Sequence, residues 1–100
     1  MSMENATRAL EPRLGEFAGL GARVKFDFGA DGALVVDATS TPPSLSQAGG
    51  DADCTITLTV DDLHKMIAGG LSPTLAYMTG KLKVAGSMGV AMKVAALLED

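Results

Sequence analysis

The sequence predicts an α+β fold, in which helices pack as a layer against a mostly antiparallel sheet. Residues 22–28 and 54–59 alternate apolar and polar side chains, which is typical of strands with one buried face. Residues 3–18 and 88–98 instead carry apolar side chains at helical spacing or in a nearly continuous run. The strands and helices are partly segregated along the chain, which favours this layered packing.

The composition indicates one globular domain, which we expect to comprise residues 1–100. Hydrophobic amino acids make up 47% of the chain and charged ones 20%. The net charge of -4 and the lack of a basic cluster argue against nucleic-acid binding and against adhesion to an anionic membrane surface. The single cysteine, Cys54, excludes an internal disulfide. We find no apolar leader or membrane-spanning run, and therefore expect a soluble, cytoplasmic protein.

Residues 3–18 are predicted to form the first helix. Leu10, Leu14 and Phe17 fall on one face at helical spacing. Pro12 lies inside this stretch, so we expect the helix to begin or to kink there, because proline lacks the backbone donor that a helix interior needs.

An antiparallel hairpin is predicted to follow. Residues 22–28 form its first strand, and a glycine-rich turn leads to a second strand at residues 34–36. Residues 38–52 contain two consecutive prolines, which exclude a central strand. Whether residues 41–50 contain a short edge strand, around Leu45, stays open at this stage.

A strand and two short helices are predicted next. Residues 54–59 alternate apolar side chains with threonines, and Asp61 and Asp62 then supply the acidic first turn of a helix. Ser72 and Pro73 are the cap and the first residue expected of a second helix. Leu75 and Met78 are the apolar residues of that second helix.

A strand at residues 81–84 and a final helix at residues 88–98, opened by Ser87, complete the predicted fold. Lys93 is the only charged residue of that helix, which is apolar nearly all round. Such a helix must be covered on more than one side, and a chain of 100 residues has little left to cover it. We therefore expect a ligand, a partner subunit or a closely packed sheet to cover it.

Together these segments form a pattern that resembles the sterol-binding domain of the sterol carrier protein 2 (SCP2-like) family. The resemblance is carried by Asp51–Leu63, by the turn Gly70-Leu71-Ser72-Pro73, by Gly80-Lys81-Leu82-Lys83-Val84 and by Gly86-Ser87-Met88-Gly89. It covers about half of the chain, whereas the first half, with residues 24–28, fits the family pattern more loosely and residues 41–50 depart from it.

The resemblance implies a five-stranded, mostly antiparallel sheet with helices over one face, enclosing an apolar tunnel. Members of this family bind sterols, fatty acids, fatty acyl-CoA, phospholipids or isoprenoid intermediates, without a catalytic residue or cofactor of their own. It therefore implies non-enzymatic binding or transfer of a lipid-like molecule. The alternative is an interaction, dimerisation or accessory module for an enzyme of lipid or quinone metabolism, with no functional cavity. Transient membrane contact and a homodimer stay open.

The residues expected to line the cavity are apolar side chains at inward positions of the predicted strands and helices. On composition alone the methionines among them are more typical of a plain core, because methionine commonly fills gaps. The resemblance favours cavity lining instead. The expected lining residues are Phe26, Phe28, Leu34, Val36, Ile56, Leu58, Met66, Leu75, Met78, Leu82, Val84, Met88 and Met92.

The sequence offers few groups for catalysis and no metal site. His64 is expected to be an exposed helix residue, because no partner motif accompanies it. Cys54 is expected to be a small buried hydrophobic residue rather than a nucleophile. Lys81 and Lys83 are expected to project from the polar face of their strand and keep it soluble; the alternative, a grip on an acyl-CoA phosphate, rests on analogy alone. A small enzyme acting on an apolar substrate is the third hypothesis.

Overall fold

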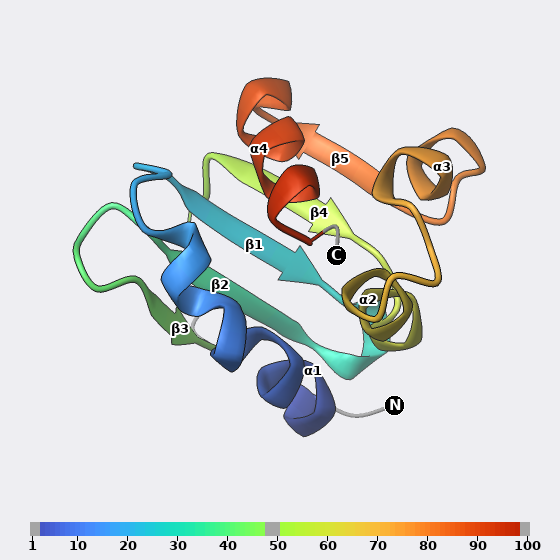
Figure 1. The fold of residues 1–100 in the computed structure, drawn as a ribbon, viewed down its shortest axis with the longest axis horizontal. Helices are drawn as coiled ribbons and strands as arrows, with labels where there is room; N and C mark the ends of the chain where they lie inside the picture. The colour runs from blue at the N-terminus through green and yellow to red at the C-terminus, as the bar shows by residue number, and fades with distance from the viewer. Residues whose placement is uncertain (1–2, 48–50, 99–100) are drawn as a thin grey trace.

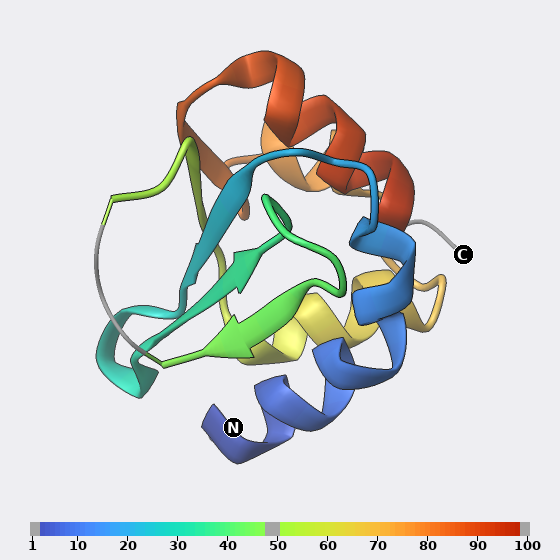
Figure 2. The same ribbon diagram turned by 90° about the vertical axis from the view of Figure 1, so that its left-hand side faces the viewer.

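A five-stranded sheet with helices on one of its faces forms the protein in the computed structural model, which describes residues 3–47 and 51–98 (Figures 1 and 2). The sheet has the order β3-β2-β1-β4-β5, in which β1 and β4 pair in parallel and the other three pairs are antiparallel. The predicted α+β class with a mostly antiparallel sheet is therefore confirmed. The strands are β1 (Arg23–Asp27), β2 (Ala33–Asp37), β3 (Ser44–Ser46), β4 (Cys54–Thr57) and β5 (Lys83–Gly86).

Within the described residues, the helical layer contains four α-helices and one 3₁₀ segment, which is longer than the 3₁₀ turn inside the hairpin. The helix predicted over residues 3–18 is divided, because Pro12 lies in the first turn of the 3₁₀ segment, where its missing donor is tolerated. Among the described residues, every helix is too short or too polar to span a lipid bilayer. The helices are α1 (Met3–Leu10), η1 (Glu11–Phe17), α2 (Val60–Ile67), α3 (Pro73–Met78) and α4 (Met88–Leu98), with a short 3₁₀ turn η2 (Gly29–Asp31) inside the hairpin.

Three hydroxyl side chains begin the helices of the second half. Ser72 Oγ accepts a hydrogen bond from the backbone of Leu75, and Ser87 Oγ accepts one from Val90, as the predicted caps require. Thr59 Oγ1 accepts from the backbone of Asp62 at 3.0 Å. The strand predicted over residues 54–59 consequently ends at Thr57, because Thr59 already serves the next helix.

The edge strand that the sequence left open is formed by β3. Leu45 of β3 is the register partner of Val36 in β2, and the strand is only three residues long. Residues 48–50, which belong to the same uncertain stretch of the sequence, lie outside the described residues.

The hydrophobic core lies between the sheet and the helices. Val24 and Phe26 of β1 are fully buried, and the Phe26 ring meets the Phe17 ring edge to face, with the ring centres 6.5 Å apart. Leu63 and Met66 of α2 pack into the same core. Figure 1 shows α1, η1 and α2 near the β2–β1 side of the sheet and α4 near β4 and β5, so the two ends of the sheet carry different helices.

Candidate ligand-binding pocket

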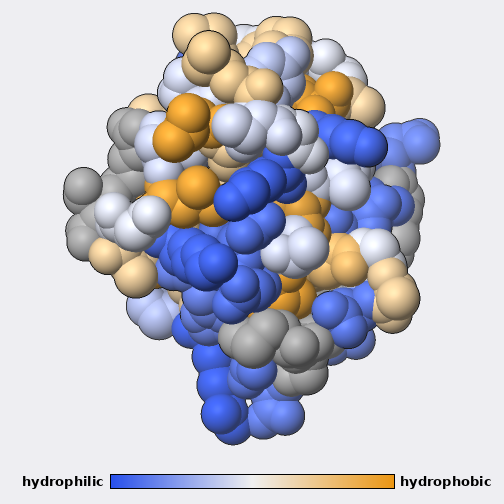
Figure 3. All heavy atoms as spheres, turned by 90° about the vertical axis from the view of Figure 1, so that its right-hand side faces the viewer, coloured by the Kyte–Doolittle hydropathy of each residue, from blue (hydrophilic) through white to orange (hydrophobic). Residues whose placement is uncertain are grey.

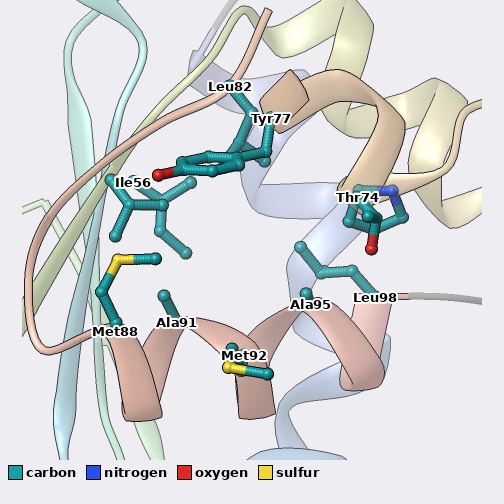
Figure 4. A pocket seen from close by; sticks show the side chains of 11 residues that line it. Ile56, Thr74, Tyr77, Leu82, Met88, Ala91, Met92, Ala95 and Leu98 are labelled. Atoms are coloured by element: carbon teal, nitrogen blue, oxygen red, sulfur yellow. The ribbon is translucent and has the colours of Figure 1, made fainter. Parts of the chain in front are cut away.

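An apolar pocket with a volume of about 230 Å³ lies between α3, α4 and the β4–β5 end of the sheet (Figure 4). Its wall comes from both strands and both helices, so it depends on the folded arrangement of the second half of the chain. The lining residues are Ile56, Pro73, Thr74, Tyr77, Leu82, Val84, Met88, Ala91, Met92, Ala95 and Leu98.

The floor of the pocket is formed by the sheet. Ile56 of β4 and Val84 of β5 are register partners, so both side chains lie on the same face, under the helices. Leu82, just before β5, is buried beside them. β5 is an edge strand that pairs only with β4, so no further strand borders the pocket floor beyond β5.

One wall is a stripe along α4. Met88, Ala91, Met92 and Ala95 follow one another at intervals of three, one and three residues, which places them on one side of the helix. Ala91 and Ala95 have the smallest apolar side chains that a helix normally carries at such positions. Their size leaves space between α4 and the sheet that larger residues would fill.

The opposite wall is the short helix α3. Ala76 is fully buried, and its carbonyl oxygen accepts hydrogen bonds from the backbone amides of Lys81 and Leu82, at 2.9 and 3.1 Å. These bonds fold the chain back after Gly80, whose φ of 80° suits glycine in such a reversal. Figure 4 shows the Tyr77 ring lying across the pocket from α4, with its hydroxyl on the side of Ile56 and Met88.

The pocket has almost no polar character. The hydroxyls of Thr74 and Tyr77 are the side-chain polar groups among its lining residues, and no lysine, arginine or carboxylate lines it. Tyr77, Met88 and Met92 are each about half or more exposed, so the pocket opens to solvent along these residues. The tunnel implied by the family resemblance stays a prediction, because this pocket is open to solvent rather than enclosed.

The residues expected to line a cavity separate into three groups. Ile56, Leu82, Val84, Met88 and Met92 do line the pocket. Leu75 and Met78 do not line it. Helix α3 turns Pro73 and Ala76 inward, so Leu75 and Met78 point outward and are 54% and 76% exposed. The remaining six are buried in the core and do not line the pocket: Phe26, Phe28, Leu34, Val36, Leu58 and Met66.

The sequence pattern did not indicate six of the lining residues. Ala91, Ala95 and Leu98 could have been found, because they continue the helical spacing of Met88 and Met92. Pro73, Thr74 and Tyr77 gave no such signal, since a helix of six residues has no clear periodicity. Contact of any of these residues with a ligand stays a prediction.

The candidate catalytic groups lie outside the pocket. Cys54 is fully buried in the core, as expected, and burial raises the pKa of its thiol. His64 is half-buried rather than exposed, and within the described residues its buried Nε2 atom has no hydrogen-bond partner. Lys81 and Lys83 are exposed. No group of His, Cys, Asp or Glu side chains in the described parts of the chain could hold a metal ion.

Comparisons with known proteins agree with this fold. The model of the SCP-2 sterol transfer family matches residues 5–99. Sterol carrier protein 2 of Rattus norvegicus is 41% identical over 70 residues, which are 69% of this chain and 13% of that protein. Hydroxysteroid dehydrogenase-like protein 2 of Homo sapiens is 47% identical over 49 residues, 49% of this chain and 12% of that protein. The chain thus spans about an eighth of the length of these relatives.

Solved structures share the architecture at lower sequence identity. Sterol carrier protein 2 from Yarrowia lipolytica, in its apo form, has a TM-score of 0.70 at 21% identity and covers 95% of this chain and 84% of its own. Sterol carrier protein 2 of Aedes aegypti, in complex with the C16 fatty acid palmitate, has a TM-score of 0.73 at 18% identity, over 98% and 96%. At these identities the likeness shows the fold. Because the family model matches almost from end to end, this chain belongs to the SCP-2 sterol transfer family.

Proposed function

We propose that the pocket between α3, α4 and β5 binds the alkyl part of a lipid-like molecule, and that residues 1–100 act as a non-enzymatic binding or transfer module. The observation that carries the proposal is the apolar lining, which places aliphatic and thioether side chains around about 230 Å³ of space. The complex of the Aedes aegypti relative with palmitate supports the same class of ligand.

The lining residues also bear on whether the pocket is the active site of an enzyme. Acid–base or nucleophilic chemistry needs titratable groups within hydrogen-bond reach of the substrate. Tyr77 is the one ionisable residue among those that line the pocket within the described chain, and Cys54 is buried in the core. These residues favour holding a ligand over converting it.

The volume predicts how the ligand is held. Sites that enclose drug-sized ligands have volumes of roughly 300–1,000 Å³, so this pocket would enclose only part of a long chain. Each methylene that enters contributes about 0.8 kcal/mol, or about fourfold in affinity. Affinity should therefore rise with the length of a fatty acid until the pocket is filled, and it should depend little on the polar end.

Two neighbouring alanines of α4 provide a matched test. Ala95 lines the pocket, whereas Ala96 is exposed and does not line it. Calorimetric titration of palmitate into the delipidated chain should show that Ala95→Phe weakens binding at least about tenfold, because the ring occupies the space of several methylenes. Ala96→Phe should bind as the unmodified chain does. Equal affinity in all three proteins, with native circular dichroism, would contradict the proposal.

A further inference from the structure

Five large apolar side chains are exposed on the side of the molecule formed by α3 and α4. They are Leu75, Tyr77, Met78, Met88 and Met92, each at least 47% exposed, and the described residues expose no other large hydrophobic side chain. We refer to these five as the apolar rim. Three of them also line the pocket, so the rim and the pocket opening form one surface. In Figure 3 hydrophobic residues are more frequent in the upper part of the view, and hydrophilic ones dominate the bottom, where α1 lies.

The charges of the chain are distributed unevenly about this surface. Residues 1–62 contain ten acidic and four basic side chains, whereas residues 63–98 contain four lysines and no acidic side chain. Lys65 pairs with Asp61 at 3.1 Å. Lys81 and Lys93 are exposed on the segments that adjoin or carry the apolar rim, and neither forms an ion pair within residues 3–47 and 51–98. Lys83 is exposed too, but it alternates with the pocket-lining Val84 along β5 and so lies on the other face of the sheet. The two acidic residues at 99–100 lie outside the described residues.

We propose that the apolar rim docks on the surface of an anionic lipid bilayer, with the pocket opening toward the acyl chains. Exposed apolar side chains that enter the boundary between head groups and acyl chains, with lysines near them, are the combination that gives binding to anionic membranes. Tyr77 suits this depth, because its ring is apolar and its hydroxyl stays hydrated. Such docking lets an alkyl chain pass between the bilayer and the pocket without crossing water. The transfer route rests on the proposed function, whereas the docking does not.

The net charge of -4 argues against adhesion of the whole molecule to an anionic bilayer, but the fold separates the charges, so docking of this one side is compatible with it. The molecule measures 32 × 27 × 23 Å, and charges separated by more than a Debye length of about 8 Å are largely screened at physiological ionic strength. Helix α1, whose one acidic side chain is Glu4, lies on the opposite side of the molecule from α4 (Figure 1). The lysines near the rim should therefore matter more for the interaction with the bilayer than the carboxylate of Glu4.

A second copy of the chain is a less suitable partner for this surface. Two rims facing each other would bring lysines of the two copies together, and the segment 63–98 offers no carboxylate to neutralise them. An anionic bilayer supplies both the apolar layer and the opposite charge. Sedimentation velocity should therefore show monomers of the chain in solution, and a dimer that loss of the rim side chains dissociates would contradict the proposal.

The single tyrosine provides a direct measurement of orientation. The chain has one tyrosine and no tryptophan, so its intrinsic emission comes from Tyr77, in the rim. With vesicles of phosphatidylcholine and phosphatidylserine that carry brominated acyl chains, we expect quenching of this emission relative to unbrominated vesicles. The Ala95→Phe variant, with its pocket blocked, should be quenched equally, because docking and not uptake of lipid brings Tyr77 to the bromines. Vesicle binding without quenching would overturn the orientation, and no vesicle binding would overturn the docking.

Surface variants separate docking from ligand binding. Leu75 and Met78 are outside the pocket, so Leu75→Ser with Met78→Ser should weaken vesicle co-sedimentation about tenfold or more while palmitate binding is unchanged. Lys81→Gln with Lys93→Gln should weaken binding to anionic vesicles at least about tenfold. The charge-matched control is Arg8→Gln with Lys65→Gln, on α1 and α2, which should retain binding. Equal losses in the two charge variants, or unchanged binding of the serine variant, would overturn the proposal.

Discussion

The guanidinium of Arg13 donates a hydrogen bond to the backbone carbonyl of Ile67, at 3.2 Å, at the last residue of α2. Its other terminal nitrogen donates to the carbonyl of Leu97, at 3.3 Å, in the last turn of α4. Carbonyl groups at a helix C-terminus have no partner within the helix and carry partial negative charge, so one cation from η1 satisfies two helix ends at once. Arg13 thereby joins the helices over the core to the helix that forms the pocket wall.

This contact predicts a measurable loss of stability when it is removed. Arg13→Met keeps the aliphatic part of the side chain, which is only 18% exposed, but leaves both carbonyl groups without their charged donor. Hydrogen bonds to charged groups contribute about 1.5–3 kcal/mol, so the free energy of unfolding in urea should fall by about that amount. Arg8→Met removes an exposed pair with Glu4 and should cost less than about 1 kcal/mol. Similar losses in both variants would contradict the role of Arg13.

A second prediction concerns Gly86, where β5 ends beside the start of β4. Its φ is 95°, and a Cβ atom there would lie 2.5 Å from the backbone oxygen of Asp53. Both the backbone conformation and the space therefore exclude a side chain, and Gly86→Ala should cost at least about 2 kcal/mol of folding free energy. Gly15→Ala is the control, because a Cβ atom at Gly15 would meet nothing within 4 Å, and we expect a change of less than about 1 kcal/mol in denaturant titrations. A stable Gly86→Ala variant would show that β5 approaches β4 less closely.

The thiol of Cys54 gives a prediction about pH. Burial raises the pKa of this thiol, so the folded protein keeps its proton at pH values where the unfolded chain, with an ordinary thiol pKa of about 8.5, has lost it. Stability should therefore be unaffected by this group below that pH and should fall as the pH rises above it. Urea unfolding between neutral and alkaline pH should show a smaller decline for Cys54→Ala than for the unmodified chain. Rapid reaction of the native thiol with Ellman's reagent near neutral pH would contradict its burial.

The order and type of most elements could be predicted from the sequence, because alternation and capping are local. Ser72 and Ser87 begin helices as expected. The exposure of Met78 could not be predicted, because α3 is apolar nearly all round and its orientation is set by hydrogen bonds from the following loop to Ala76. The short strand β3 depends on pairing with β2 and carries little pattern of its own.

The position of the pocket was only partly predictable for a related reason. Alternation identifies which strand residues point toward the helices, but it does not say which helices cover them. Phe26 and Ile56 are equivalent in pattern, and they are even register partners in β1 and β4. Ile56 borders the pocket, whereas Phe26 packs against Phe17 in the core. This difference follows from the order of the strands in the sheet, which pairing over long sequence distances decides.

The methionine methyl groups provide the most direct measurement of where a ligand binds. Met88 and Met92 line the pocket, Met66 of α2 is fully buried in the core, and Met78 is exposed outside the pocket. In carbon–proton spectra of the chain labelled at its methionine methyls, titration with palmitate should shift the signals of Met88 and Met92 and leave that of Met66 nearly unchanged. Shifts at Met66 with unchanged signals of Met88 and Met92 would contradict binding between α3, α4 and β5.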